Sequence, residues 1–209
     1  MFWVAESTNG RAVTQNAKSN VVKVVDFLWL AELYCKVATN ARVVSLAKSL
    51  GVSFDSLRAL NIGWDGKAWT FPMRDPSGKV VGIRRRFPDG KKLSVRGGHE
   101  GLFYDTAYPT GDIYVCEGPT DTAAMLTIGL QAIGRPSCSG GTKFLVEICA
   151  ARRVVIVADG DAPGLRGARE LKAQLSNATV IVPPDRSKDV RAWVNAGATK
   201  NDVLAMISP

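Results

Sequence analysis

Histidine and paired cysteine are scarce in this chain of 209 residues. His99 is the only histidine, and the four cysteines, Cys35, Cys116, Cys138 and Cys149, include no C-x-x-C pair. A zinc ribbon needs closely spaced cysteines or histidines, and a dithiol redox centre needs C-x-x-C. The composition therefore argues against both kinds of site and predicts reduced thiols in a cytoplasmic protein.

Long apolar runs are also missing. No stretch approaches the roughly 20 apolar residues that cross a bilayer, and residues 1–20 lack the pattern of a secretory signal. With 46% hydrophobic and 22% charged residues, the chain has the composition of an ordinary globular protein. We therefore expect no membrane association and a cytoplasmic location, with residues 1–20 as a poorly ordered leader.

Acidic residues are under-represented in the first half. The chain carries a net charge of +8 at pH 7, and residues 1–110 hold 16 Lys/Arg against 9 Asp/Glu. Residues 111–209 hold 11 against 10. Lysines that serve only solubility would be spread evenly. The asymmetry favours a basic surface that binds a phosphate backbone beside an acidic centre.

The first half begins with three expected helices. Apolar residues recur at helical spacing over 21–37 and 41–50. Gly51 is a typical C-terminal stop, and Ser53 is a typical N-cap for a third helix over 53–60.

Two strands and a basic segment follow these helices. Residues 67–87 alternate like two strands joined by a hairpin turn at 75–78, and a basic loop and a further strand come next. We expect a leader and amphipathic helix over 1–40 and a smaller mixed α+β subdomain over 41–110.

Strands and helices alternate regularly from residue 112. Expected strands cover 112–116, 131–134, 153–158 and 178–182, and expected helices cover 120–129, 142–150, 164–175, 188–195 and a last turn to about 207. This rhythm predicts an α/β domain over 111–209, with a mostly parallel sheet covered by helices on both faces.

Acidic residues follow two of these strands. Glu117 ends the first strand, and a Gly-Pro turn leaves Thr120 to cap a helix that carries Asp121. Asp159 and Asp161 come directly after the strand VVIV, so we expect their side chains to point the same way. Singly, such residues are commonly surface charges. Gathered at the carboxyl edge of a parallel sheet, they predict a divalent cation site.

The motifs EGPTD (117–121), SGG (139–141) and DGDAPG (159–164) together resemble the Toprim domain. This Rossmann-like catalytic fold is shared by topoisomerases, bacterial-type primases and some nucleases. The resemblance covers about residues 111–195 and implies Mg²⁺, or Mn²⁺ in its place, as the cofactor. It implies that Glu117 is a general acid/base or metal ligand, that Asp159 and Asp161 bind the metal, and that Asp121 supports them.

PPDRSKD (183–189) resembles the third acidic element of primase-type members, which would add Asp185 and Asp189 as metal ligands. The pattern departs at Arg191, which falls where a further acid is often found, so a second metal site is in doubt. Gly140 and Gly141 either cradle a phosphate before the next helix or serve as turn glycines.

The first half resembles the amino-terminal part of the bacterial-type primase catalytic core, also called its RNA polymerase domain. LAKSLGVSFDSLRALNIGWDG (46–66), FPMRDPSGKVVGIRRR (71–86) and KKLSVRGGHEGLFY (91–104) match it in order. The resemblance implies that a basic strip lines the groove for template and incoming nucleoside triphosphate. Its residues are Arg74, Arg84, Arg85, Arg86, Lys91, Lys92 and Arg96. Arginine suits this role because its planar fork binds phosphate in a bidentate manner.

No Cys/His zinc module precedes the matched region, and no helicase-binding tail follows it. We therefore expect a minimal, stand-alone primase core of the kind carried by a phage or mobile element. Its expected partners are single-stranded DNA, nucleoside triphosphates and, for the missing functions, a replicative helicase or a separate zinc-module protein.

The expected function is primer synthesis on single-stranded DNA by a metal-dependent nucleotidyltransferase. One rival is a Toprim nuclease that hydrolyses the same bonds, which we rank lower because such nucleases lack the FPMRD hairpin. A second rival is a catalytically silent, primase-like protein that binds single strands, against which the intact Glu117, Asp159 and Asp161 argue.

Overall fold

The computed structural model describes residues 25–105, 107, 111–184 and 187–207. The expected leader over 1–20, most of the expected boundary at 108–111 and Asp185 lie outside the described residues. None of the helices in the described part of the chain has the length and apolarity that a membrane crossing requires.

Three helices open the described chain. α1 (Phe27–Val37) begins later than the expected residue 21, because Asp26 caps it by accepting a hydrogen bond from the Trp29 N–H at 3.0 Å. α2 (Asn40–Leu50) ends at Gly51, which adopts the left-handed φ of 67°. α3 (Phe54–Ala59) is capped by Ser53, as predicted.

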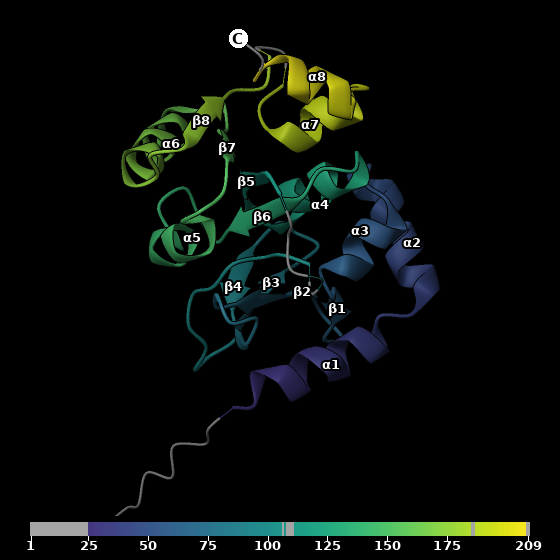
Figure 1. Ribbon diagram of the computed structural model, residues 1–209. Helices are drawn as coiled ribbons and strands as arrows, with labels where there is room; N and C mark the ends of the chain where they lie inside the picture. Colours follow the sequence, from purple (N-terminus) through teal and green to yellow (C-terminus); the bar gives the residue numbers. More distant parts are fainter. Residues whose placement is uncertain (1–24, 106, 108–110, 185–186, 208–209) are drawn as a thin grey trace, which may run out of the picture.

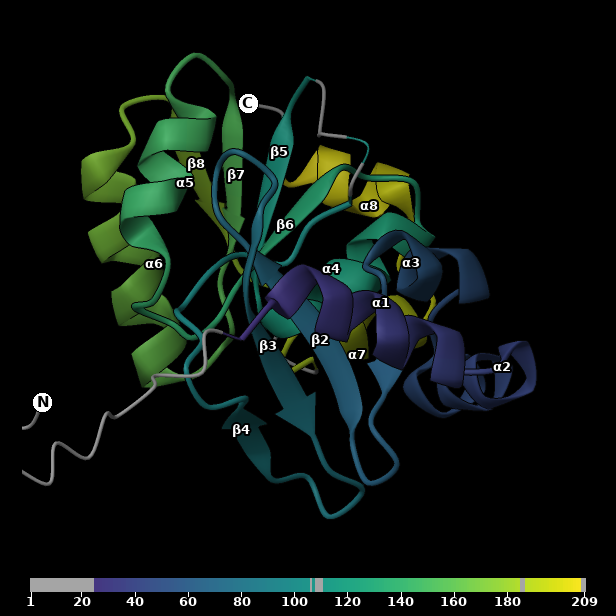
Figure 2. The same cartoon turned by 90° about the horizontal axis from the view of Figure 1, so that it is seen from below.

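A four-stranded antiparallel sheet follows. Its strands are β1 (Gly63–Trp64), β2 (Trp69–Arg74), β3 (Val80–Arg86) and β4 (Lys92–Ser94), in the order β1-β2-β3-β4. The predicted hairpin turn at 75–78 joins β2 to β3. α1 packs on one face of this sheet, where Phe27 and Ala31 meet Val80 and Ile83 (Figures 1 and 2).

The second sheet is parallel throughout, as predicted. β5 (Ile113–Glu117), β6 (Ala132–Arg135), β7 (Val154–Val157) and β8 (Ala178–Ile181) lie in the order β6-β5-β7-β8. The strands are buried apolar runs because helices cover both faces.

In the described part of the chain, five helices cover this sheet (Figure 1). They are α4 (Gly118–Thr127), α5 (Thr142–Cys149), α6 (Ala162–Gln174), α7 (Val190–Asn195) and α8 (Lys200–Ala205). Leu145 of α5 and Leu171 of α6 pack on one face of the sheet. Met125 of α4 and Val203 of α8 pack on the other.

A short segment at residues 102–103 joins the two sheets. Leu102 forms an antiparallel bridge with Arg74 at the end of β2, and Phe103 forms one with Gly134 in β6. Phe103 also shares an apolar cluster with Phe71 and Ala123. The core therefore runs from one sheet to the other and places β3 beside the carboxyl ends of β5 and β7. The domain boundary near residue 110 stays a prediction.

Candidate active site in the cleft between the two sheets

Glu117 and Asp121 lie at the junction of β5 and α4. Glu117 is the last residue of β5, and Gly118 turns the chain with a φ of 79°, so that α4 begins there. The prediction that Thr120 caps this helix was wrong, because the N-cap is Glu117, three residues earlier. Thr120 instead donates its hydroxyl to the Asp121 carboxylate at 3.3 Å.

Asp159 and Asp161 differ in their exposure and in their contacts. Asp159 lines the cleft, whereas Asp161 is exposed and caps α6 by accepting a hydrogen bond from the Gly164 N–H at 2.7 Å. Both residues lie beyond β7, which ends at Val157, so strand alternation does not set their directions, and a common direction stays a prediction. Asp161 still acts electrostatically, since its charge helps to raise the pKa of Glu117.

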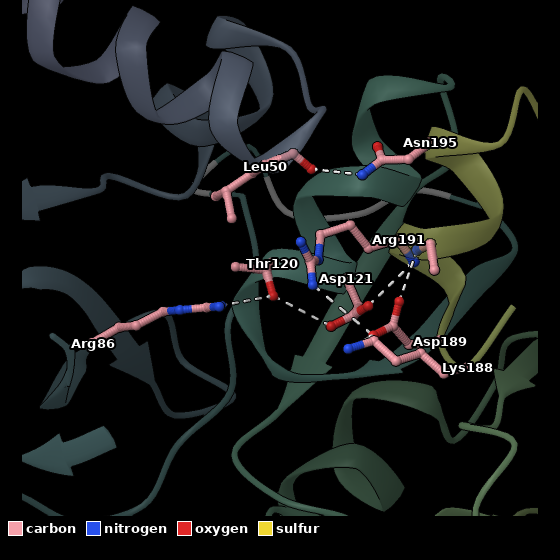
Figure 3. Close-up of polar contacts among 9 residues, drawn as sticks. Leu50, Arg86, Thr120, Asp121, Lys188, Asp189, Arg191 and Asn195 are labelled. Atoms are coloured by element: carbon pink, nitrogen blue, oxygen red, sulfur yellow. Dashed lines mark hydrogen bonds and ion pairs between the residues drawn. The ribbon is translucent and has the colours of Figure 1, made fainter. Parts of the chain in front are cut away.

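Asp189 comes from the start of α7. It caps that helix by accepting a hydrogen bond from the Ala192 N–H at 2.7 Å. Its carboxylate also lies 3.9 Å from the Lys188 ammonium and 3.9 Å from the Arg191 guanidinium. The main-chain N–H of Arg191 donates to Asp121 at 3.2 Å, which ties α7 to α4 (Figure 3).

These side chains meet in one cleft of about 200 Å³ between the two sheets. Its acidic residues are Glu117, Asp121, Asp159 and Asp189. Its basic residues are Arg84 and Arg86 of β3, Lys92 of β4, Lys188 and Arg191. The cleft thus combines carboxylates from the parallel sheet with cations from the antiparallel sheet.

Burial and mutual repulsion raise the pKa of three carboxyl groups in the cleft. Burial first, and the charge of Asp189 second, raise the pKa of Asp121 to about 6. Burial, together with the charges of Asp121 and Glu117, raises the pKa of Asp159 to about 7. The pKa of Glu117 is raised by burial and by Asp161, while Lys92 and Arg135 oppose that shift. The site therefore has an excess of negative charge at its acidic end.

The four carboxylates of the cleft are suitable ligands for a hard divalent cation. Carboxylate oxygens are the ligands that Mg²⁺ prefers, and the raised pKa values of Asp121 and Asp159 show a local potential that a cation would relieve. Among the residues that the structure describes, no three acidic, histidine or cysteine side chains are already arranged to hold a metal. The residues that would hold it are Asp159 and Glu117, with Asp121 and Asp189 behind them.

Only part of the predicted basic strip faces the cleft. Arg84, Arg86 and Lys92 line it, whereas Lys91 and Arg96 are exposed elsewhere. Arg85 points to the opposite side of β3, where it pairs with Asp65 at 2.5 Å. For Arg85 the groove expectation was wrong, because alternation along β3 turns its side chain away from the cleft. Lys91 and Arg96 lie next to the ends of β4, and their role in binding stays a prediction.

Arg74 does not line the cleft either, which corrects another expectation. Its side chain is buried, and its Nη1 donates to the Gly78 carbonyl at 2.9 Å inside the β2–β3 turn. The register shift at the end of β2 accompanies this inward placement. The residue therefore stabilises the hairpin.

The glycine loop before α5 is held by a residue that the sequence reasoning missed. Arg135, buried at the end of β6, donates to the carbonyls of Gly140 and Gly167 and to the Thr142 hydroxyl. The Gly140 N–H donates to the Ser137 hydroxyl at 3.0 Å, so it is not available to a phosphate. This contact indicates that Gly140 serves as a turn glycine and does not bind a phosphate through its N–H.

Sequence reasoning also missed Lys188 and Arg191 as cleft residues. Arg191 was noted only as a departure from an acidic pattern. A signal was present, since Arg191 lies two residues after Asp189 in the N-terminal turn of a helix. The sequence does not show which face of the sheet α7 covers. Only that placement brings the first turn of α7 next to Asp121.

Comparison with known proteins gives a related sequence and a shared fold. No protein-family model matches the chain. The Gene 57 protein of Mycobacterium phage D29 is 32% identical over 123 residues, which cover 56% of this chain and 80% of that protein. The Escherichia coli primase catalytic core superposes with a TM-score of 0.68 at 19% identity, covering 86% of this chain and 77% of that one.

A DnaG primase catalytic domain bound to single-stranded DNA superposes equally well. Its TM-score is 0.67 at 19% identity, with 87% of this chain and 76% of that chain covered. These matches show that the chain has the fold of the primase catalytic core, with a Toprim-type parallel sheet after an antiparallel sheet.

Proposed function

The chain belongs to the same family as the Gene 57 protein of Mycobacterium phage D29, and we propose that it synthesises primers on single-stranded DNA as a metal-dependent nucleotidyltransferase. The observation that carries the proposal is the mixed cleft. Carboxylates at the ends of β5 and β7 face arginines and a lysine from the antiparallel sheet. Nucleotidyl transfer needs both groups, one to hold a cation and one to hold phosphates.

Glu117 and Asp159 are the proposed catalytic carboxylates. These two carboxylates would hold Mg²⁺, which would supply positive charge for the transfer of the nucleotidyl group. Glu117 is half-buried, and burial raises its pKa above the ordinary value of a glutamate, which favours a role in proton transfer. The Asp121 carboxylate accepts hydrogen bonds from the Thr120 hydroxyl and the Arg191 N–H, and these bonds hold α4 and α7 together beside the two catalytic carboxylates.

Arg84 and Lys92 are the proposed contacts to the template strand. Both line the cleft from the antiparallel sheet, and Lys92 is exposed at its edge. Single-stranded DNA is supported as a partner by the solved primase domain of the same fold that is bound to it. A helicase or a separate zinc-module protein as a further partner remains part of the proposal.

One observation favours a second candidate function. The cations that line the cleft would bind single strands in a catalytically silent protein as well. The antiparallel sheet contains the FPMRD hairpin, which Toprim nucleases lack, so it argues against the nuclease function.

A synthesis assay separates these functions. The full chain is incubated with labelled nucleoside triphosphates and single-stranded template, with Mg²⁺ or with EDTA, and the products are separated by size. New labelled oligomers with Mg²⁺ only, and none from Asp159→Asn, support the proposal. Arg169→Gln, which alters an exposed residue of α6 outside the cleft, should behave like the wild type. Template shortening without new oligomers would support the nuclease, and binding without either product would support the silent protein.

A further inference from the structure

Arg135 is a buried cation whose hydrogen-bond partners are neutral. It is the last residue of β6 and is 4% exposed, and its three hydrogen bonds go to oxygens that carry no charge. None of the ion pairs in the described part of the chain includes it. Burial lowers the pKa of its guanidinium, because a charge in this position loses much of its hydration. An apolar side chain would avoid that cost, so packing alone does not account for an arginine here.

The hydrogen bonds of Arg135 join segments that are separate in the sequence. Its Nε donates to the Gly140 carbonyl at 3.0 Å, and its Nη2 donates to the Thr142 hydroxyl, at the start of α5, at 3.0 Å. Its Nη1 donates to the Gly167 carbonyl of α6 at 3.3 Å. The planar fork of arginine makes these three contacts at once, in directions that a lysine ammonium does not reproduce. Arg135 therefore links β6 to the start of α5 and to α6.

α6 in turn packs against Asp159. This residue lies beyond the end of β7, so the ladder of the sheet does not hold it. The first turn of α6 contacts it instead, since a Cβ at Gly164 would lie 2.8 Å from the Asp159 Cβ. One turn further along α6, a Cβ at Gly167 would overlap the Cys138 carbonyl. The loop over 136–141, which Arg135 holds, therefore packs directly on the helix that contacts Asp159.

Glu117 lies at the other end of this link. β5 and β6 are neighbouring parallel strands, and Glu117 is the register partner of Arg135. Arg135 thus lies beside one of the two proposed catalytic carboxylates and bonds to the helix that contacts the other. A metal site needs its ligands held in place, and contacts behind the ligands supply that support.

We propose that Arg135 is a positioning residue that holds Asp159 in place relative to Glu117 for the binding of a divalent cation. The inference rests on the proposed function, since it concerns the same two carboxylates, and it adds a residue behind them. Arg135 acts through α6 and the loop over 136–141, and not by contact with the metal. The competing explanation is that its charge only offsets the charge of Glu117.

Two variants separate position from charge. Arg135→Lys keeps the charge and loses the fork, so a positioning role predicts weaker metal binding, whereas a role of charge alone predicts no change. Thr142→Val removes one acceptor of the fork and leaves the charge in place.

The probe is Mn²⁺ alone, added to the full-length protein at pH 8 without nucleotide or DNA. Electron paramagnetic resonance of the free ion gives the dissociation constant. Arg135→Lys should raise it about tenfold, the lower end of what the loss of a contact behind the ligands costs a metal site. Thr142→Val should raise it by less, because two of the three hydrogen bonds remain.

Val203→Ala is the matched control for a loss of stability. Val203 is a fully buried residue of α8 on the opposite face of the parallel sheet. Its truncation should lower the midpoint of urea unfolding and leave the Mn²⁺ affinity as in the wild type. An equal loss of Mn²⁺ affinity in Val203→Ala would overturn the proposal in favour of general destabilisation.

Wild-type affinity in both Arg135→Lys and Thr142→Val would overturn the proposal in favour of a role of charge alone. A wild-type protein that binds no Mn²⁺ would overturn it as well. If circular dichroism shows that Arg135→Lys fails to fold, Thr142→Val decides the outcome.

These results separate the inference from the proposed function. Mn²⁺ binding that depends on Arg135, in a protein that makes no primers, would keep the positioning role and remove the primase. Primer synthesis by Arg135→Lys at the wild-type rate, with unchanged Mn²⁺ affinity, would keep the primase and remove the positioning role.

Discussion

Phe103 and Gly134 exchange two main-chain hydrogen bonds, at 2.9 and 2.7 Å, across the gap between the two sheets. This pair fixes the end of β6 beside the segment that leads from the antiparallel sheet. β6 neighbours β5, whose last residue is Glu117, so the pair links the segment after the antiparallel sheet to the strands that carry the acidic residues. The cleft therefore depends on a contact that contains no charged residue.

Gly134→Ala should destabilise the protein by about 1–3 kcal/mol, the usual cost of overpacking a core. A Cβ at this position would lie 2.2 Å from the Thr122 hydroxyl and 2.9 Å from the Gly118 carbonyl. Urea unfolding followed by circular dichroism measures the change. Gly160→Ala is the matched control, since its Cβ would meet nothing closer than 3.8 Å. Equal stability of Gly134→Ala and the wild type would show that the strand shifts freely.

Asp159→Asn should abolish primer synthesis and flatten the pH dependence of stability. The pKa of Asp159 is about 7 in the folded protein, above its ordinary value of 3.8. The stabilisation from its neutral form is fully present below pH 3.8 and is lost as the pH rises through about 7. Without metal, the variant should therefore gain stability relative to the wild type at pH 8, and less so at pH 5.

Urea unfolding in EDTA at both pH values measures this effect. Mg²⁺ should stabilise the wild type at pH 8 more than the variant, because it binds the ionised carboxylate. A variant that keeps the pH dependence of the wild type, or that synthesises primers at the wild-type rate, would contradict the assignment.

Glu117→Gln should reduce the turnover number far more than the affinity for template. A carboxylate repels the phosphates of a strand, so its proposed role is in the reaction step and not in holding the template. Single-turnover synthesis and anisotropy with labelled template measure the two quantities separately. Equal losses in rate and affinity would point to a structural glutamate at the β5–α4 turn.

Replacing Arg84 and Lys92 together should weaken the salt dependence of single-stranded DNA binding. Each phosphate that the variant no longer neutralises should lower the log–log slope by about 0.7. Arg85→Gln should leave the slope unchanged, since Arg85 faces away from the cleft and pairs with Asp65. The slopes come from anisotropy titrations over a range of salt concentrations. A larger change in Arg85→Gln than in the double variant would place the DNA on the opposite face of the sheet.

The parallel sheet and two of its carboxylates could be predicted from the sequence. Buried strands such as VVIV are continuous apolar runs, and parallel order follows from regular alternation with helices. The carboxyl ends of neighbouring parallel strands meet at one edge, so Glu117 and Asp159 had to lie near one another. These inferences succeed because they depend on local periodicity and on topology.

The composition of the cleft was decided only by the tertiary structure. Asp161 became a helix cap because β7 ends before it, and Arg74 turned inward at an irregular point of β2. Arg191 reached Asp121 because α7 packs on the same face of the sheet as α4, a contact between positions seventy residues apart. Periodicity carries information over one element, whereas the direction of a side chain beyond the end of an element depends on the packing of distant segments.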